Sequence, residues 1–164
     1  MSTLRIRRFV PADAQGVMGV ILPIQREEFG IPITAEDQPD LHSIPSFYQS
    51  GVGDFLVAEE GGHVVGTVGL KDIGAGQAAL RKMFVAPAWR GREHGVAQAL
   101  LQNMLGHARG RAVRDIFLGT TDAFAAAHRF YEKNGFRRID PRSLPGSFPR
   151  MAVDTRFYGL RLGS

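Results

Sequence analysis

The chain has 164 residues, a formal net charge of +4 and no cysteine. Its length fits one domain, 1–164, with a full hydrophobic core, and the lack of thiols excludes disulfides and favours a reducing, cytoplasmic location. No apolar stretch approaches the roughly 20 residues that span a bilayer. No nucleic-acid-binding motif accompanies the modest positive charge. We therefore expect neither a membrane nor a nucleic-acid partner.

The first third of the chain is expected to hold a strand, a helix and a long loop. TLRIRRF alternates Leu4 and Ile6 with arginines, as a half-buried strand does. A helix is predicted over 11–29, with Pro23 interrupting it. Residues 30–53 are rich in proline and polar side chains, which indicates a long loop with a short helix near 44–49.

The rest of the chain predicts alternating strands and helices. DFLVAEEGGHVVGTVGL is typical of two strands joined by a glycine turn, and QAALRKMFV of a third. An amphipathic helix follows Gly95, RDIFLGT is a strand, and Asp122 is expected to cap a helix that runs to Asn134. FRRID and RMAVDTRFYGL are the last two strands. This order predicts an α/β fold, a mixed sheet with helices on its faces.

The stretch WRGREHGVA, residues 89–97, indicates an anion-binding turn. Gly91 and Gly95 lack the Cβ atoms that would hold a diphosphate away from the backbone, and Arg90 and Arg92 add positive charge. The helix that follows presents free N–H groups at its start. A plain surface loop fits the same residues. Neither GxxxxGK[ST] nor the dinucleotide motif GxGxxG is present.

A second cluster, AAAHRFYEKNGF, lies on the predicted helix that ends near Asn134. Phe124, Ala127, His128 and Tyr131 share one face of this helix by their spacing. A tyrosine on such a face is either a core aromatic residue or a positioned proton donor.

The pair of motifs RKMFVAPAWRGREHGVAQALL and FYEKNGF resembles the GNAT superfamily of acyl-CoA-dependent N-acetyltransferases, and the element order matches as well. The cofactor signature of that family, Arg/Gln-x-x-Gly-x-Gly/Ala, fits Arg92 to Ala97. The resemblance implies the acyl-CoA N-acyltransferase fold, with a mostly antiparallel sheet of about seven strands. It also implies an enzyme that uses acetyl-CoA as co-substrate and needs no metal.

The resemblance further implies which residues bind the cofactor. The strand at 77–85 would hold the pantetheine arm through backbone groups, and the turn would hold the pyrophosphate, with either Arg90 or Arg92 on phosphate. Tyr131 matches the tyrosine that protonates the departing thiolate in many members. The expected cofactor-binding residues are Met83, Phe84, Val85, Arg90, Gly91, Arg92, His94, Gly95, Val96, Ala97 and Tyr131. Where many members have an asparagine seven residues before the tyrosine, this chain has Phe124.

Acetylation of an amine requires a group that accepts the proton of that amine. The candidate residues are Glu27, Glu28, His42, Glu59, Asp72 and His128. Glu28, beside the long loop, is the first choice as the catalytic base. The five histidines show no ligand spacing, so no metal site is expected.

These observations predict transfer of an acetyl group from acetyl-CoA to a primary amine of a small molecule. Acidic residues of the long loop, Asp40 among them, are expected to attract the cationic amine, and Phe47, Tyr48 and Phe148 to pack against its carbon skeleton. A catalytically silent module that binds CoA or a metabolite is the alternative, and a basic nucleic-acid binder comes third. An exposed last strand would allow a homodimer across a two-fold axis.

Overall fold

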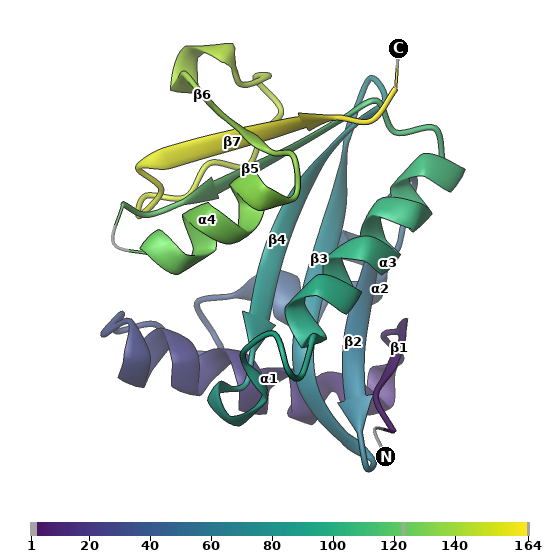
Figure 1. Ribbon diagram of the computed structural model, residues 1–164, viewed down its shortest axis with the longest axis vertical. Coiled ribbons are helices and arrows are strands. Elements are labelled where there is room, and N and C mark those ends of the chain that lie inside the picture. Colours follow the sequence, from purple (N-terminus) through teal and green to yellow (C-terminus); the bar gives the residue numbers. More distant parts are fainter. Residues whose placement is uncertain (1–2, 123, 164) are drawn as a thin grey trace.

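The computed structural model describes residues 3–122 and 124–163, and these residues form a seven-stranded sheet (Figure 1). The strands are β1 (Arg5–Arg8), β2 (Asp54–Glu60), β3 (His63–Gly74), β4 (Gln77–Val85), β5 (Asp115–Thr120), β6 (Arg137–Ile139) and β7 (Arg156–Arg161). Across the sheet they follow the order β1-β2-β3-β4-β5-β7-β6. The predicted α/β fold with about seven strands is confirmed.

The sheet is antiparallel except where β4 meets β5, which confirms the predicted mostly antiparallel arrangement. These two strands pair in parallel only over Gln77–Ala79 and Asp115–Phe117, although β4 continues to Val85. Beyond Ala79 the two strands diverge, and Figure 1 shows the separation between them. This divergence leaves one edge of β4 without a strand partner.

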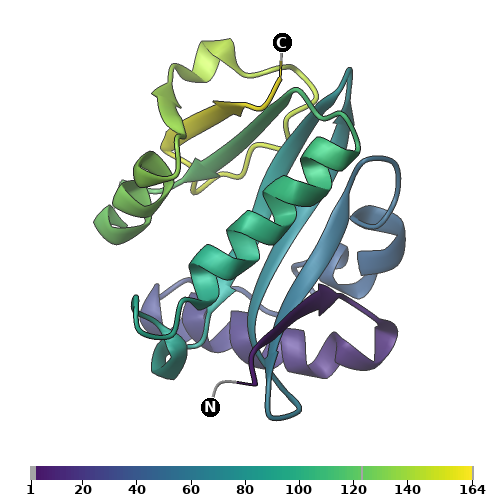
Figure 2. The ribbon, with the colours of Figure 1, turned by 45° about the vertical axis from the view of Figure 1, so that its right-hand side comes forward.

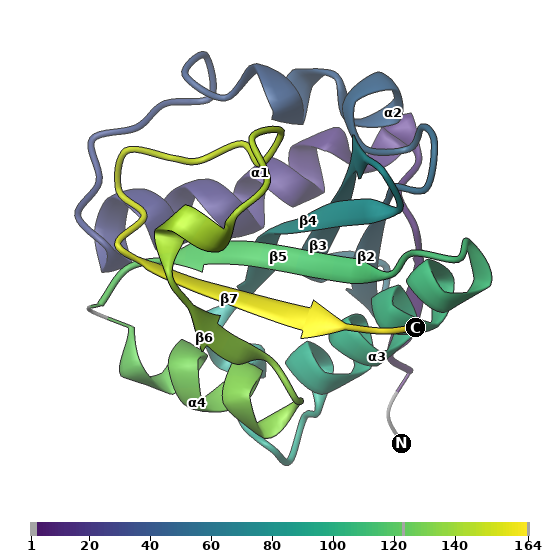
Figure 3. The same ribbon diagram turned by 90° about the horizontal axis from the view of Figure 1, so that it is seen from above.

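Helices cover both faces of the sheet (Figure 3). α3 (Val96–Gly110) and α4 (Ala125–Lys133) lie on one face, and α1 (Ala14–Pro23) and α2 (Ile44–Phe47) on the other. Figure 2 shows α3 lying across β2, β3 and β4, on which it packs. Single 3-10 turns occur at Pro11–Asp13, Pro39–His42, Pro87–Trp89 and Pro141–Ser143. In the part of the chain that the structure describes, no helix has the length and apolarity to cross a membrane.

Each face of the sheet carries its own hydrophobic core. The stripe of α3 that periodicity predicted is buried against the strands, and its members are Val96, Leu100, Leu101, Met104, Leu105 and Ala108. On the other face Val17, Ile21, Ile44 and Tyr48 pack together with Phe55 of β2. A fully buried side chain of this size contributes about 1.5–3 kcal/mol, so the two cores hold helices to both faces.

The helix predicted over 11–29 is divided at Pro23, as expected. Proline has no N–H to donate, and α1 ends there. The chain continues as a π-helix over Ile24–Glu28, in which the Phe29 amide donates to the Ile24 carbonyl at 2.9 Å.

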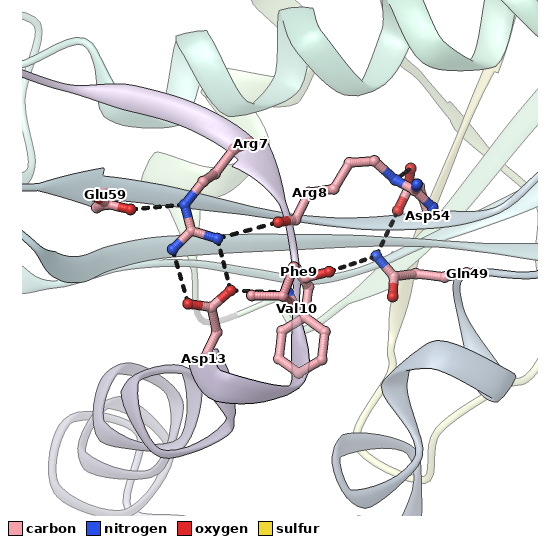
Figure 4. A network of polar contacts seen from close by, with 8 residues as sticks. All are labelled: Arg7, Arg8, Phe9, Val10, Asp13, Gln49, Asp54 and Glu59. Atoms are coloured by element: carbon pink, nitrogen blue, oxygen red, sulfur yellow. Dashed lines mark hydrogen bonds and ion pairs between the residues drawn. The ribbon is translucent and has the colours of Figure 1, made fainter.

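A polar network fixes the N-terminal strand to the start of the α1 segment (Figure 4). Two guanidinium nitrogens of Arg7 donate to the Asp13 carboxylate at 2.8 Å each, and the third donates to Glu59 at 2.7 Å. The Val10 amide also donates to Asp13, at 2.9 Å. These contacts hold the pKa of Asp13 below its usual value, with the hydrogen bond from Arg7 as the largest cause.

Two local predictions are wrong. The last strand begins only at Arg156 and lies between β5 and β6, so β7 is not an exposed edge that could pair with a second copy. The edges of the sheet are β1 and β6, and the homodimer stays a prediction without that support. The N-cap of α4 is Phe124 rather than Asp122, whose carboxylate accepts from Arg156 at 3.1 Å.

Candidate active site

The glycine-rich turn leads directly into α3. Gly91 has a φ of +104° and Gly95, the N-cap, a φ of +64°. A Cβ at position 95 would meet no atom closer than the Arg92 carbonyl oxygen at 3.9 Å. Glycine is therefore needed at position 95 for its left-handed backbone rather than for space.

Three amides at the start of α3 are available to an anion. The first intrahelical hydrogen bond runs from Ala99 N–H to the Gly95 carbonyl at 3.0 Å. The amides of Val96, Ala97 and Gln98 precede it, and none of them donates to an acceptor within the described residues. Free amides at the positive end of a helix dipole are a general means of binding phosphate.

The two arginines of the turn differ in their contacts. Arg90 donates from Nε to the Val85 carbonyl at 2.9 Å and from its two terminal nitrogens to the Glu28 carboxylate at 2.5 and 2.8 Å. Arg92 is exposed and makes no contact with an acceptor among residues 3–122 and 124–163. Arg92 is thus the arginine that is free to meet a phosphate, and the His94 ring beside it packs edge-on against Trp89 at 5.2 Å.

The ion pair with Arg90 also changes the chemistry of Glu28. The hydrogen bond from Arg90 lowers the pKa of the Glu28 carboxyl. A lower pKa makes a carboxylate a weaker proton acceptor, which argues against Glu28 as the base while this pair is intact. Glu27 and Glu28 line a cavity of about 300 Å³ together with α1 and Pro87.

Strand β4 contains a bulge before the segment expected to bind pantetheine. Lys82 has a φ of +56°, and its carbonyl accepts a hydrogen bond from Thr67 Oγ1 at 2.7 Å. The register of β3 against β4 shifts at this point, so that Val68 faces two residues of β4. Residues 83–85 follow the bulge, on the part of β4 from which β5 has already diverged. Apart from the Val85 carbonyl, which accepts from Arg90, the backbone groups on that edge are available to an extended ligand.

Tyr131 lies on α4 with its ring buried among aromatic side chains. The centroids of Phe136, Phe130 and Tyr158 are 5.5, 5.6 and 6.2 Å away. Burial raises the pKa of Tyr131, so the phenol stays protonated, and no described residue hydrogen-bonds to its hydroxyl. A protonated phenol of this kind can donate to a thiolate.

Phe124 takes part in an aromatic contact where the family resemblance implied an asparagine. Its ring stacks on Phe29 at 4.0 Å, and Phe29 in turn lies 6.4 Å from Phe84 of β4. These three rings connect the end of the π-helix with β4 and with the start of α4. The position therefore supplies an apolar contact and no amide.

Apart from Glu27, which lines the cavity beside Glu28, the remaining candidate bases have other partners. Both ring nitrogens of His128 are occupied, Nδ1 by Arg156 at 3.0 Å and Nε2 by the Thr121 carbonyl at 2.7 Å. Glu59 binds Arg7, Asp72 accepts the Val52 and Gly74 amides, and His42 contacts the Ala35 carbonyl. Within the described ranges no group of three or more His, Cys, Asp or Glu residues could hold a metal.

A buried polar cluster joins the long loop to the β4 bulge, and the sequence did not reveal it. Lys82 donates to Gln38 at 2.8 Å and lies 3.7 Å from the Asp40 carboxylate, which accepts the Tyr48 hydroxyl at 2.6 Å. Gln38 and Gln25 exchange two amide hydrogen bonds. Burial lowers the pKa of Lys82. Asp40 and Tyr48 are therefore buried loop anchors. That Asp40 attracts the amine and Tyr48 packs against its carbon skeleton stays a prediction, and this burial gives it no support.

Comparison with known proteins agrees with this geometry. The sequence model of the acetyltransferase (GNAT) family matches residues 20–136. The mouse protein probable N-acetyltransferase family 8 member 5 is 35% identical over 104 residues, which are 62% of this chain and 46% of the relative. N-acetylaspartate synthetase of Danio rerio is 33% identical over 127 residues, which are 74% of this chain and 44% of the relative. The chain spans less than half the length of these two relatives.

A solved structure resembles the whole chain. The crystal structure of a GNAT-family acetyltransferase from Staphylococcus aureus Mu50 shares 36% sequence identity and superposes with a TM-score of 0.93. The match covers 98% of this chain and 100% of that one. The family model alone covers more than half of the present chain. The chain therefore belongs to the acetyltransferase (GNAT) family.

Proposed function

We propose that the protein transfers the acetyl group of acetyl-CoA to a primary amine of a small molecule. The observation that carries this proposal is the divergence of β4 from β5, directly before the turn whose three free amides begin α3. An unpaired strand edge followed by an anion site suits a ligand with an extended amide-bearing arm and a diphosphate.

In this proposal the pyrophosphate is bound by the amides of Val96, Ala97 and Gln98 and by the Arg92 side chain. Arg90, the other candidate, has a different role because it already binds Glu28 and the Val85 carbonyl. The pantetheine arm lies along residues 83–85 and forms hydrogen bonds with the β4 edge. Gly91 and Gly95 give the turn the shape that brings its backbone to the phosphates.

The chemical step is a direct attack by the amine. The neutral nitrogen bonds to the thioester carbonyl carbon, the tetrahedral intermediate collapses, and the carbon–sulfur bond breaks with its electron pair on sulfur. Tyr131 donates a proton to the departing sulfur and recovers one from solvent. Much of the rate enhancement arises from holding the nitrogen and the carbonyl carbon in line, which the rigid β4 strand permits.

The small size of the acceptor is supported by two observations. The relative from Danio rerio is named for N-acetylaspartate, a small product that carries carboxylate groups. In this chain the contacts among Lys82, Asp40 and Gln38 anchor the long loop at 30–53 to β4. The anchored loop covers the sheet face that would receive the amine, which leaves room for a small acceptor.

A thiol-release assay tests the proposal. The purified protein is incubated with acetyl-CoA and a panel of amines, amino acids and peptides, and free coenzyme A is measured with a thiol reagent. We expect release that depends on a small amine, with the acetylated amine identified by mass spectrometry. Tight acetyl-CoA binding by calorimetry without release for any amine would favour a silent binding module. Release with peptides alone would overturn the small-molecule acceptor.

A further inference from the structure

Arg81 and Asp154 flank the β4–β5 divergence on the face of the sheet that α1 and α2 cover. Arg81 of β4 pairs with Gly69, and a Cβ on Gly69 would touch Tyr48, which belongs to the core of that face. Asp154 lies in the loop before β7 and contacts Gly119 of β5. The neighbour of Gly119 in β5, Leu118, is part of the core on the opposite face, so Gly119 and Asp154 are on the side of Arg81.

The charge of Arg81 has no acidic partner. Its guanidinium lies 5.6 Å from the centre of the Phe47 ring and donates to the Met151 sulfur at 3.4 Å. No carboxylate within residues 3–122 and 124–163 forms an ion pair with it. The neighbouring cation on β4, Lys82, is by contrast buried and already bound to Gln38 and Asp40. A half-buried guanidinium without a counter-ion is suited to bidentate binding of a carboxylate, with two parallel N–H···O hydrogen bonds.

Asp154 is held in place by the backbone rather than by a cation. One oxygen of its carboxylate accepts the Met151 amide at 3.0 Å, and the same oxygen would lie 2.5 Å from a Cβ at position 119. Only glycine at 119 lets the carboxylate lie so close to β5. The other oxygen has no partner among the described residues and is not shielded from solvent. This oxygen is available to a hydrogen-bond donor of a ligand.

The two groups influence each other without touching. Burial raises the pKa of the Asp154 carboxyl, and the Met151 hydrogen bond together with the positive charges of Arg81 and Arg150 only partly offsets that effect. The two side chains form no ion pair: Arg81 extends from β4 and donates to the Met151 sulfur, whereas Asp154 lies in the loop before β7 and accepts the Met151 amide. A ligand that carries both charges would satisfy both side chains at once.

On the basis of the proposed function, we infer that the acceptor is a zwitterionic α-amino acid bound between Arg81 and Asp154. The α-carboxylate binds the Arg81 guanidinium, and the α-ammonium group donates to the free oxygen of Asp154. One proton passes from the ammonium group to Asp154 and on to water, which leaves the neutral amine that attacks the thioester. The second nitrogen-bound proton leaves after the carbon–nitrogen bond has formed, and the sulfur is protonated as described above.

The test compares α-amino acids with their amides, which keep the amine but lack the carboxylate. We expect the protein to acetylate the preferred amino acid with a kcat/KM about 10- to 100-fold higher than its amide, the range for a lost charge-assisted hydrogen bond. Arg81→Gln should remove this preference by lowering kcat/KM for the acid alone. Asp154→Asn should lower kcat/KM for acid and amide alike, since both carry the amine. Arg109→Gln, which removes an exposed positive charge on α3, should change neither.

The outcomes separate this inference from the proposed function. Thiol release at equal rates for acids and amides, or an equal loss for both in Arg81→Gln, would overturn the amino-acid site and leave the acetyltransferase intact. Absence of release with every amine would overturn the proposed function and this site with it. Thermal melting of each variant shows whether it is folded. Gly119→Ala keeps both charges but displaces the Asp154 carboxylate, so it should lower kcat/KM for acid and amide alike, as Asp154→Asn does.

Discussion

The backbone strain at the start of α3 can be measured with two glycine substitutions in the same segment. Gly95 has a φ of +64°, and a Cβ there would be free of collisions. Gly106 lies within α3, is exposed, and a Cβ there would also meet nothing within 4 Å. In Gly106→Ala and Gly95→Ala alike, alanine restricts the unfolded chain to the same extent. The two variants therefore differ mainly in the cost of placing an L-residue in the left-handed region.

That cost is about 1–2 kcal/mol. We expect Gly106→Ala to raise the free energy of unfolding by about 0.5–1 kcal/mol, the advantage of alanine over glycine within a helix. The free energy of unfolding of Gly95→Ala should be about 1–2 kcal/mol lower than that of Gly106→Ala. In a chain of this size each kcal/mol corresponds to roughly 2–4 °C in Tm. Urea unfolding followed by circular dichroism, with equal m-values, gives both quantities.

The same pair reports on the anion site. Gly106→Ala should bind coenzyme A as the parent protein does. In Gly95→Ala the unliganded turn can relieve its backbone strain by leaving the left-handed conformation at position 95. Binding of coenzyme A requires that conformation again, so the strain then weakens the affinity. Calorimetry should then show an affinity up to about 30-fold weaker, which corresponds to 2 kcal/mol. Equal stability of the two variants, together with equal affinity for coenzyme A, would refute the argument that position 95 requires glycine for its backbone.

Three further substitutions test other parts of the molecule. Tyr131→Phe should lower turnover severalfold to about a hundredfold at unchanged acetyl-CoA affinity, because only the proton donor is lost; equal turnover would exclude the acid role. Glu28→Gln should leave turnover within about threefold, since the exposed pair with Arg90 makes Glu28 a weak base, and a loss beyond tenfold would restore Glu28 as the base. Asp13→Asn should lower the free energy of unfolding at pH 7 by about 1–3 kcal/mol. The pKa of Asp13 is lower in the folded chain, so this difference should be complete above about pH 5 and shrink as the pH falls below that value; a difference that is undiminished at about pH 2 would point to another cause.

The main elements of the fold could be predicted because their signals are local. The stripe of α3 repeats with helical spacing over 15 residues, and the glycine pair at 61–62 joins two β-rich segments. The cap of α4 was mispredicted because Asp122 has a partner from β7, Arg156, which lies far away in the chain. Helix-capping rules cannot weigh a competing contact of that kind.

The candidate site was only partly accessible from sequence for the same reason. The turn at 90–97 and Tyr131 belong to contiguous motifs, whereas the ion pair of Arg90 with Glu28 and the cluster around Lys82 join segments about 40 to 60 residues apart. Asp154 carries no motif, and its position depends on Gly119 of another strand. Long-range contacts of these kinds require the folded structure.

The short pairing of β4 with β5 has a thermodynamic consequence. Beyond Ala79, β4 has no strand partner on the side of β5, so the protein alone leaves backbone groups along this seam without strand hydrogen bonds. An extended ligand that binds along the seam takes the place of the missing strand. Binding of such a ligand is therefore coupled to folding. A ligand that binds only the native protein raises the melting temperature, and the increase grows with the ligand concentration. Along this seam the same hydrogen bonds bind the co-substrate and replace the missing strand pairing. Hydrogen exchange of the backbone amides should therefore slow first at this seam as the co-substrate is added.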